Sequence, residues 1–252
     1  NKAGGSGGAI HIVDGIVAYS ITINNGTFTR NVANGNATDA GGGAIWAQLG
    51  TDAVNVFQIT GSLFGGPSSL LGNSAPRGVG GAIALSGGRL AFVDPTVPLG
   101  GGVVASHFQS NSAGGDADSN GKGGSGGAIY VNGGILSVVQ SSFIGNSSTH
   151  GTGGGIYFNN IDGGNATKLW VVNSTFNGNS ADQAGGALIN RDTNGAVDIR
   201  NSTIAGNSSA DNTAAGNAIV GGGGFYNANG YNGGPNFARS FVANTLIASN
   251  TA

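Results

Sequence analysis

The chain has 252 residues, of which 52 are glycine and only 8% are charged, and its formal net charge is −2. Such a composition gives no electrostatic basis for binding nucleic acid or an anionic membrane. The absence of cysteine excludes a disulfide framework, a cysteine-based zinc site and a reactive thiol. No apolar run reaches the roughly 18 residues of a membrane helix, so we expect no membrane insertion.

Two short sequence steps alternate along the whole chain, and each occurs seven times. The first begins with glycine and ends with an aliphatic or aromatic residue: Gly8-Ala9-Ile10, Gly43-Ala44-Ile45, Gly81-Ala82-Ile83, Gly127-Ala128-Ile129, Gly154-Gly155-Ile156, Gly186-Ala187-Leu188 and Gly223-Gly224-Phe225. The second places asparagine three residues after an apolar side chain: Phe28 to Asn31, Leu70 to Asn73, Phe108 to Asn111, Phe143 to Asn146, Phe176 to Asn179, Ile204 to Asn207 and Ile247 to Asn250. Self-similarity of this kind is typical of repeat proteins, whose units stack on one another.

Each repeat favours β-structure over helix. Apolar residues recur at every second position, and glycine costs about 1 kcal/mol per helical position relative to alanine. We interpret each repeat as one coil of three short strands. The sequence therefore predicts an all-β fold, a right-handed parallel β-helix of about seven coils that is uncapped at both ends and forms one domain over residues 1–252. A hairpin sandwich fits less well, because its successive strands would differ from one another.

The second and third coils contain four of the five prolines: Pro67, Pro76, Pro95 and Pro98. Proline cannot donate a hydrogen bond to an inner ladder. The sequence therefore predicts loop excursions near 65–79 and 94–102. Two further loops, polar or rich in glycine, are predicted near 114–125 and 209–221.

Stacking of the coils predicts columns of like residues inside the helix. Phenylalanines 28, 108, 143 and 176 would form one column of the core. The asparagines of the second step would form a structural ladder: Asn31, Asn73, Asn111, Asn146, Asn179, Asn207 and Asn250. Asparagine is suited to this place because it tolerates turns and because stacked amides hydrogen bond along a ladder. A second, partial polar ladder is predicted at Asn25, Gln140, Asn173, Asn201 and Asn244.

The position after each first-step apolar residue would point outward, and four aromatic residues and one histidine occupy it: His11, Trp46, Tyr130, Tyr157 and Tyr226. These side chains would form one exposed stripe. One interpretation is that their stacking only stabilises the face of the sheet. The other is a contact surface that packs against a neighbouring fibre or stacks on the rings of a glycan.

Few residues suggest a metal site or a catalytic site. Asp116, Asp118 and Asn120 have the spacing that begins a calcium loop, but glycine replaces glutamate at its twelfth position. We interpret this segment as a weak calcium site at most, with a solvated loop as the alternative, and expect no other cofactor. The remaining aspartates are scattered, and Asp198 with Arg200 in one strand suggests an outward ion pair. Enzymes that cleave polysaccharides need two or three carboxylates close together. Because the aspartates here are scattered, the sequence predicts that the protein is not an enzyme.

The paired GGA-[ILV] and F-x-x-N steps resemble the repeats of the chlamydial polymorphic outer membrane proteins. More broadly they are similar to the β-helical passengers of autotransporter adhesins. The resemblance covers nearly the whole chain and implies a parallel β-helix at the cell surface that acts in adhesion.

The residues at the two ends of the chain, Ser249 to Ala252 and Asn1 to Ile10, would join into a further repeat if they were placed in sequence. Complementary open ends predict stacking of copies head to tail, which grows a fibre. We therefore expect an extracellular or cell-surface structural protein that forms a filament with itself. The alternatives are an adhesin passenger excised from a longer surface protein and, less consistent with the scattered carboxylates, a polysaccharide-active enzyme.

Overall fold

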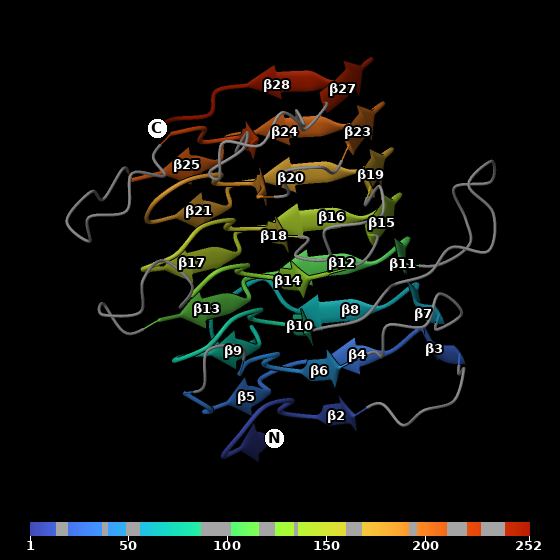
Figure 1. Cartoon of the computed structure of the whole chain (residues 1–252), viewed down its shortest axis with the longest axis vertical. Coiled ribbons are helices and arrows are strands. Elements are labelled where there is room, and N and C mark those ends of the chain that lie inside the picture. The colour runs from blue at the N-terminus through green and yellow to red at the C-terminus, as the bar shows by residue number, and fades with distance from the viewer. Residues whose placement is uncertain are drawn as a thin grey trace.

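The computed structural model describes residues 1–13, 20–36, 40–48, 56–86, 102–115, 124–133, 136–159, 168–191, 196–210, 221–227 and 240–252. Within these ranges the strands form four parallel sheets of seven strands each. Each coil of the chain adds one strand to every sheet, and the two termini lie at opposite ends of the stack (Figure 1). The protein is a parallel β-helix of seven coils, as the repeats predict.

The four sheets are named A to D. Sheet A contains β1 (Lys2–Ala3), β5 (Val32–Ala33), β9 (Ser74–Ala75), β13 (Ser112–Gly114), β17 (Ser147–Thr149), β21 (Ser180–Ala181) and β25 (Ser208–Ser209). Sheet B contains β2 (Ile10–Val13), β6 (Ile45–Gln48), β10 (Ile83–Ser86), β14 (Ile129–Asn132), β18 (Ile156–Asn159), β22 (Leu188–Asn190) and β26 (Phe225–Asn227). Sheet C contains β3 (Ser20–Asn24), β7 (Val56–Thr60), β11 (Gly102–Val104), β15 (Leu136–Val139), β19 (Lys168–Val172), β23 (Ala196–Arg200) and β27 (Ser240–Ala243). Sheet D contains β4 (Thr27–Phe28), β8 (Leu63–Gly65), β12 (His107–Gln109), β16 (Ser142–Ile144), β20 (Thr175–Asn177), β24 (Thr203–Ala205) and β28 (Leu246–Ala248).

A coil has four strands, so the expected three strands per coil are wrong. The strand that was not predicted follows the second sequence step. The apolar residue of that step lies in sheet D, and its asparagine lies beyond a corner, just before a strand of sheet A. In the fourth coil, Phe143 lies in β16, Gly145 turns the chain with a φ of 61°, and Asn146 leads directly into β17. The pattern located this corner correctly, but strands of two or three residues are too short to show an alternation of their own.

The glycine that begins each first step is preceded by another glycine, and the two have separate roles. Gly126 adopts a φ of 70°, in the left-handed region that glycine enters without strain. Gly127 has no room for a side chain, because a Cβ there would collide with the carbonyl oxygen of Gly154 in the next coil. The first glycine therefore turns the chain into sheet B, and the second allows neighbouring coils to approach to the spacing of paired strands.

A column of five phenylalanines lies at the centre of the core: Phe28, Phe64, Phe108, Phe143 and Phe176. Their ring centroids are 4.7 Å apart, and neighbouring rings are parallel to within 5°. In the second coil the sequence pattern selected Leu70, whereas the stacked residue is Phe64. Leu70 is 81% exposed, because a turn is inserted between β8 and the asparagine of that coil.

The inserted turn is part of the excursion predicted near 65–79. The chain leaves sheet D after Gly65 and rejoins the coil at Asn73 and β9, so only the segment between them departs from the helix. The excursions predicted near 94–102, 114–125 and 209–221 lie largely outside the described residues.

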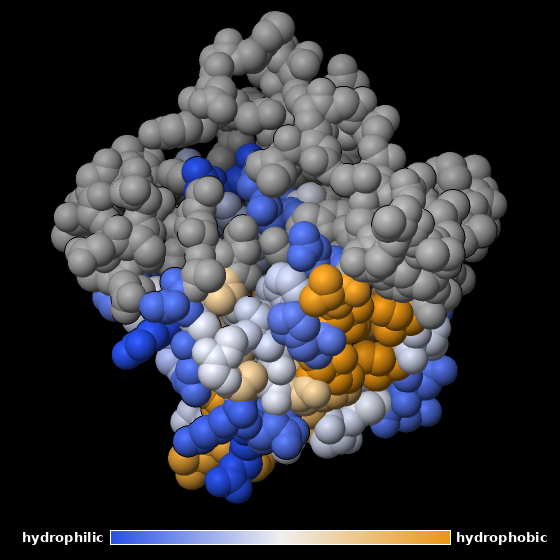
Figure 2. All heavy atoms as spheres, turned by 60° about the horizontal axis from the view of Figure 1, so that its bottom comes forward, coloured by the Kyte–Doolittle hydropathy of each residue, from blue (hydrophilic) through white to orange (hydrophobic). Residues whose placement is uncertain are grey.

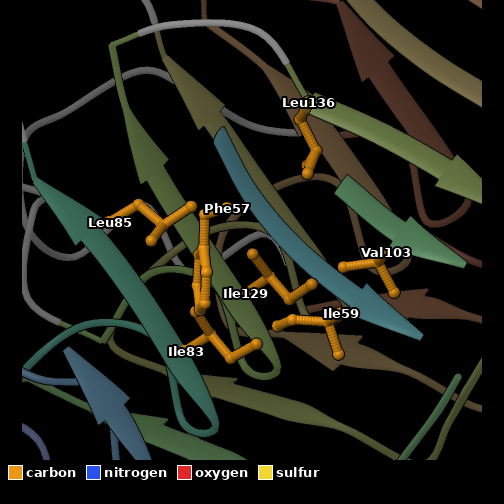
Figure 3. A pocket seen from close by; sticks show the side chains of 7 residues that line it. All are labelled: Phe57, Ile59, Ile83, Leu85, Val103, Ile129 and Leu136. Carbon is orange, nitrogen blue, oxygen red and sulfur yellow. The ribbon is translucent and has the colours of Figure 1, made fainter. Parts of the chain in front are cut away.

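A small apolar cavity of about 10 Å³ lies between sheets B and C in the second to fourth coils (Figure 3). Its lining comes from Phe57, Ile59, Ile83, Leu85, Val103, Ile129 and Leu136. A cavity of this size holds no organic ligand, and we interpret it as a packing defect.

Filling this cavity should stabilise the protein. We expect Val103→Ile to raise the free energy of unfolding by up to about 0.8 kcal/mol, because one further methylene is buried without displacing a neighbour. Thermal unfolding measures the change. Val138→Ile is the matched control, since Val138 lies above Val103 in the same column, is fully buried and does not line the cavity. Overpacking should lower the stability of that variant, and equal effects of both substitutions would contradict the prediction.

Candidate functional site

The seven asparagines of the predicted ladder lie one above another inside the helix. Each of the first six donates a side-chain Nδ2–H to the Oδ1 of the asparagine in the next coil over 2.8–3.0 Å. The backbone N–H of the same residue donates to the same oxygen over 2.9–3.1 Å. Asn1 extends the ladder by one position, since its Nδ2 lies 2.9 Å from the Oδ1 of Asn31.

The ladder leaves no polar group of its central side chains without a partner. Asn111, which is fully buried, donates to Asn146 Oδ1 over 3.0 Å and to the carbonyl oxygen of Phe64 over 3.0 Å. Its own Oδ1 accepts two hydrogen bonds from Asn73. An unpaired buried amide costs several kcal/mol, about 1–3 for each group that loses its partner. The amide groups of a central ladder asparagine are therefore satisfied through the coils on either side.

A second interior ladder consists of hydroxyl groups and was not predicted. Its members are Ser62, Ser106, Ser141, Ser174, Ser202 and Thr245. At each step a backbone N–H donates to the hydroxyl oxygen of the next coil, over 3.1 Å from Ser141 to Ser174. The hydroxyl in turn donates to a carbonyl two residues earlier, as Ser141 does to Val139 over 2.8 Å.

The residues predicted as a second polar ladder are exposed instead, and all except Asn25 lie one position before these hydroxyls. Asn25, Gln140, Asn173, Asn201 and Asn244 all have φ values between 48° and 52° and turn the chain from sheet C into sheet D. The left-handed backbone conformation at this corner explains why four of these five residues are asparagine, because asparagine tolerates this conformation better than most residues. The recurrence of serine or threonine directly after the corner was the signal available in the sequence.

The aromatic stripe on the outer face of sheet B forms stacks but is not exposed along its length. His11 stacks on Trp46 with centroids 4.5 Å apart, and Tyr130 stacks on Tyr157 at 4.9 Å. Tyr130 and Tyr157 are each only 2% exposed, whereas His11 is exposed and Trp46 and Tyr226 are half-buried. The predicted contact surface is therefore wrong for the two central tyrosines.

The burial of these tyrosines has a physical cause in the connections from sheet A to sheet B. Val79 and Ala184 belong to these connections, and both pack with Tyr130, Tyr157, Ala84 and Ile189 in a second apolar cluster outside the coil. The cluster buries the middle of the stripe, and its aromatic rings contribute to stability. Alternation along a strand predicts which side of the sheet a residue faces, but not what covers that side.

The ion pair expected at Asp198 and Arg200 is present and lies on the outer face of sheet C. Arg200 donates from Nε to Asp198 over 2.7 Å and from Nη2 over 2.8 Å, and Asp198 is only 6% exposed. The hydrogen bond and the charge of Asp198 raise the pKa of Arg200 above its ordinary value. The guanidinium also lies 5.0 Å from the ring centroid of Phe241. Bidentate pairing and ring contact indicate a structural role in joining two coils.

The remaining candidates for metal binding or catalysis are the weak calcium spacing and His107. Asp116, Asp118 and Asn120 of the weak calcium spacing lie outside the described residues. The residues that the structure does describe contain no group of three or more histidines and acidic residues that could hold a metal ion. His107 Nδ1 lies 2.7 Å from Ser142 Oγ on the exposed face of sheet D. Its column continues with Leu63 and Thr175, so no carboxylate in this column orients the histidine.

The two terminal coils expose apolar side chains. In the last coil, Val242 is 43%, Leu246 58% and Ile247 48% exposed. In the first coil, Ile10, Ile12, Ile21, Ile23 and Phe28 are only partly buried against the core. Figure 2 turns this N-terminal end toward the viewer and shows hydrophobic side chains gathered on it. Both ends of the described helix therefore present surface that a further coil would bury.

No family model, curated protein or solved structure matches the chain significantly. The described residues contain no helix that is long and apolar enough to cross a membrane. The ladders, the stacks and the terminal coils are therefore the features of the chain that bear on its function.

The central side-chain amides of the ladder should make a large contribution to the free energy of unfolding. Asn111→Leu would leave the backbone N–H and one Nδ2 hydrogen of Asn73 without an acceptor, and it would remove one donor each from Asn146 Oδ1 and the Phe64 carbonyl oxygen. We expect a loss of roughly 3 kcal/mol or more in the free energy of unfolding. Denaturant unfolding measures it. The matched control is Asn177→Ala on the exposed face of β20, which should change stability by less than about 0.5 kcal/mol. Similar losses in the two variants would contradict the role of the ladder.

The burial of the central tyrosines also predicts a stability effect. Tyr157→Ala should lower the free energy of unfolding by about 3 kcal/mol, because it removes a buried ring from the second apolar cluster. His11→Ala, at the exposed end of the same column, should cost less than about 1 kcal/mol. Thermal unfolding compares the two variants. A fully stable Tyr157→Ala protein would restore the interpretation of this stripe as an exposed contact surface.

Proposed function

We propose that this protein is structural, a rigid β-helical subunit of an extracellular or cell-surface filament. The observation that carries the proposal is the asparagine ladder, which continues through all seven coils with hydrogen bonds of 2.8–3.0 Å between side chains. The polar side chains that recur in every coil bond along the axis of the helix. Groups arranged in this way support axial assembly rather than the binding of a small molecule.

The exposed apolar residues of the terminal coils support stacking of copies head to tail. Ile247 is 48% exposed although Ile204, directly below it in the same column, is fully buried. The strands at both ends have an unpaired edge among the described residues. Unpaired edges with apolar inner faces are templates for further strands. When one copy covers the last coil of another, its own last coil stays open. Such a heterologous contact does not close into a ring, so its repetition adds copies to a growing fibre.

The alternative function is the rigid stalk of an adhesin, as the resemblance to autotransporter passengers implies. In that arrangement further coils of the same polypeptide would cover the terminal coils. The two functions differ in the behaviour of the purified chain, because only the filament requires copies to associate with each other.

Electron microscopy and sedimentation of the purified chain test the filament. We expect long, thin, unbranched fibres whose formation depends on protein concentration. Ile247→Asp should abolish them, because it places a charge on the apolar surface that the next copy would bury.

Leu70→Asp is the matched control. It introduces the same charge at a residue that is 81% exposed in a turn on the side of the coil, so fibres should persist. A wild-type chain that remains monomeric at high concentration would refute the filament and leave the adhesin stalk. Thermal unfolding of both variants verifies that each one is folded.

A further inference from the structure

The asparagine ladder has a direction, so the two ends of the helix carry different hydrogen-bonding groups. At the C-terminal end, the Oδ1 of Asn250 accepts two hydrogen bonds from Asn207, and its Nδ2 donates one hydrogen to the carbonyl oxygen of Ile204. In the other coils, the backbone N–H and the second Nδ2 hydrogen donate to the following asparagine. At Asn250 the described residues offer these two donors no acceptor.

The N-terminal end carries the complementary group. Asn1 donates from Nδ2 to Asn31 over 2.9 Å, and its Oδ1 receives no hydrogen bond from the described residues. Two C-terminal ends would bring donors against donors, and two N-terminal ends would bring acceptors against acceptors. Only contact of a C-terminal end with an N-terminal end continues the ladder. A buried polar group without a partner is costly, so the ladder selects this orientation.

We propose that the last coil of one copy binds the first coil of a second copy in one register, with Asn1 of the second copy directly above Asn250. This inference rests on the proposed filament and specifies its joint, the contact between the two terminal coils. Because strands pair in register throughout the helix, placing Asn1 fixes every other pair at the joint. Ile23 of the second copy then lies above Val242, and Phe28 above Ile247.

This register buries the side chains that the terminal coils expose. Val242 and Ile247 are 43% and 48% exposed, and both would meet an apolar residue that is itself only partly buried in the first coil. Phe28 above Ile247 would also begin a new column of stacked phenylalanines on the column that ends in Ile204 and Ile247. Burial of these apolar groups favours association by about 25 cal/mol for each Å² removed from water.

Two polar residues of the last coil face the core at the joint, and they are already paired. Asn190 donates to Asn227 Oδ1 over 2.8 Å, and Asn227 donates to Ser240 Oγ over 2.7 Å. The register places Ile12 and Ile21 of the second copy above Asn227 and Ser240. These isoleucines can cover the pair without breaking its hydrogen bonds, so the polar positions do not oppose the joint.

Introduced cysteines can test the register directly. The chain contains no cysteine of its own, so any disulfide must form between the introduced residues. Thr27 and Leu246 occupy the same outward column of sheet D, and both are exposed. Across the joint their Cα atoms would lie about 4.8 Å apart, within the range of about 4.4–6.8 Å that a disulfide requires. Six coil spacings separate the two positions within one copy, so a disulfide between them must join two copies.

We expect the Thr27→Cys/Leu246→Cys variant to form a series of covalent multimers under oxidising, non-reducing conditions, and to lose them on reduction. The Leu63→Cys/Leu246→Cys variant is the matched control. Its cysteines would lie about 9.6 Å apart in this register, two coil spacings, and should give no multimers. The Leu246→Cys and Thr27→Cys single variants should each remain monomeric on the same gel.

The other outcomes separate the joint from the filament. Covalent dimers of a single variant would show contact between like ends, and multimers of the Leu63→Cys variant would show a register shifted by one coil. Either result overturns the proposed joint. Fibres that form without disulfides in the Thr27→Cys/Leu246→Cys variant also overturn it but leave the filament standing. Absence of both fibres and disulfides refutes the filament and the joint together.

Discussion

Each coil of this protein depends on its neighbours for the hydrogen bonds of its buried amides. Asn146 shows the dependence: it donates to Asn179 in the next coil and to Phe108 in the preceding coil, and it accepts from Asn111. Burying these groups without the neighbouring coils to pair them would cost about 1–3 kcal/mol for each. The repeat is therefore stable only as a stack, as in other solenoids, in which interfaces between neighbouring units supply much of the stability.

The glycine pairs make this dependence geometrically possible. Amide ladders and ring stacks both need a constant spacing close to that of paired strands, and the phenylalanine centroids are 4.7 Å apart. A side chain at Gly127 would collide with the backbone of the next coil and force the coils apart. The high glycine content, which could suggest a disordered chain, thus reflects a requirement for close and regular contact.

Most of the fold could be predicted from the sequence, because like residues recur at constant offsets and parallel pairing places them in register. The asparagine ladder was predictable for the same reason. The pattern failed at Leu70, where an inserted turn separates Phe64 from its asparagine and a second apolar residue happens to fit the step. It also failed at Tyr130, since alternation indicates the side of a sheet but not the segment that covers it. Ser141 was missed because serine is common in polar positions, and only the structure shows its hydroxyl bonding inward.

A ladder in which every amide donates in the same direction gives the helix a chemical polarity that its apolar core lacks. Burial of Ile247 or Val242 would be satisfied by any apolar surface, because the hydrophobic effect has no direction. The donors of Asn250 can be paired only by a surface that offers a hydrogen-bond acceptor at the corresponding place. In the proposed filament, apolar contact would therefore supply the driving force for adding a coil, while the amides would restrict which coil is added and in which orientation. Specificity of this kind is a difference between one bonded arrangement and others that leave buried groups unpaired.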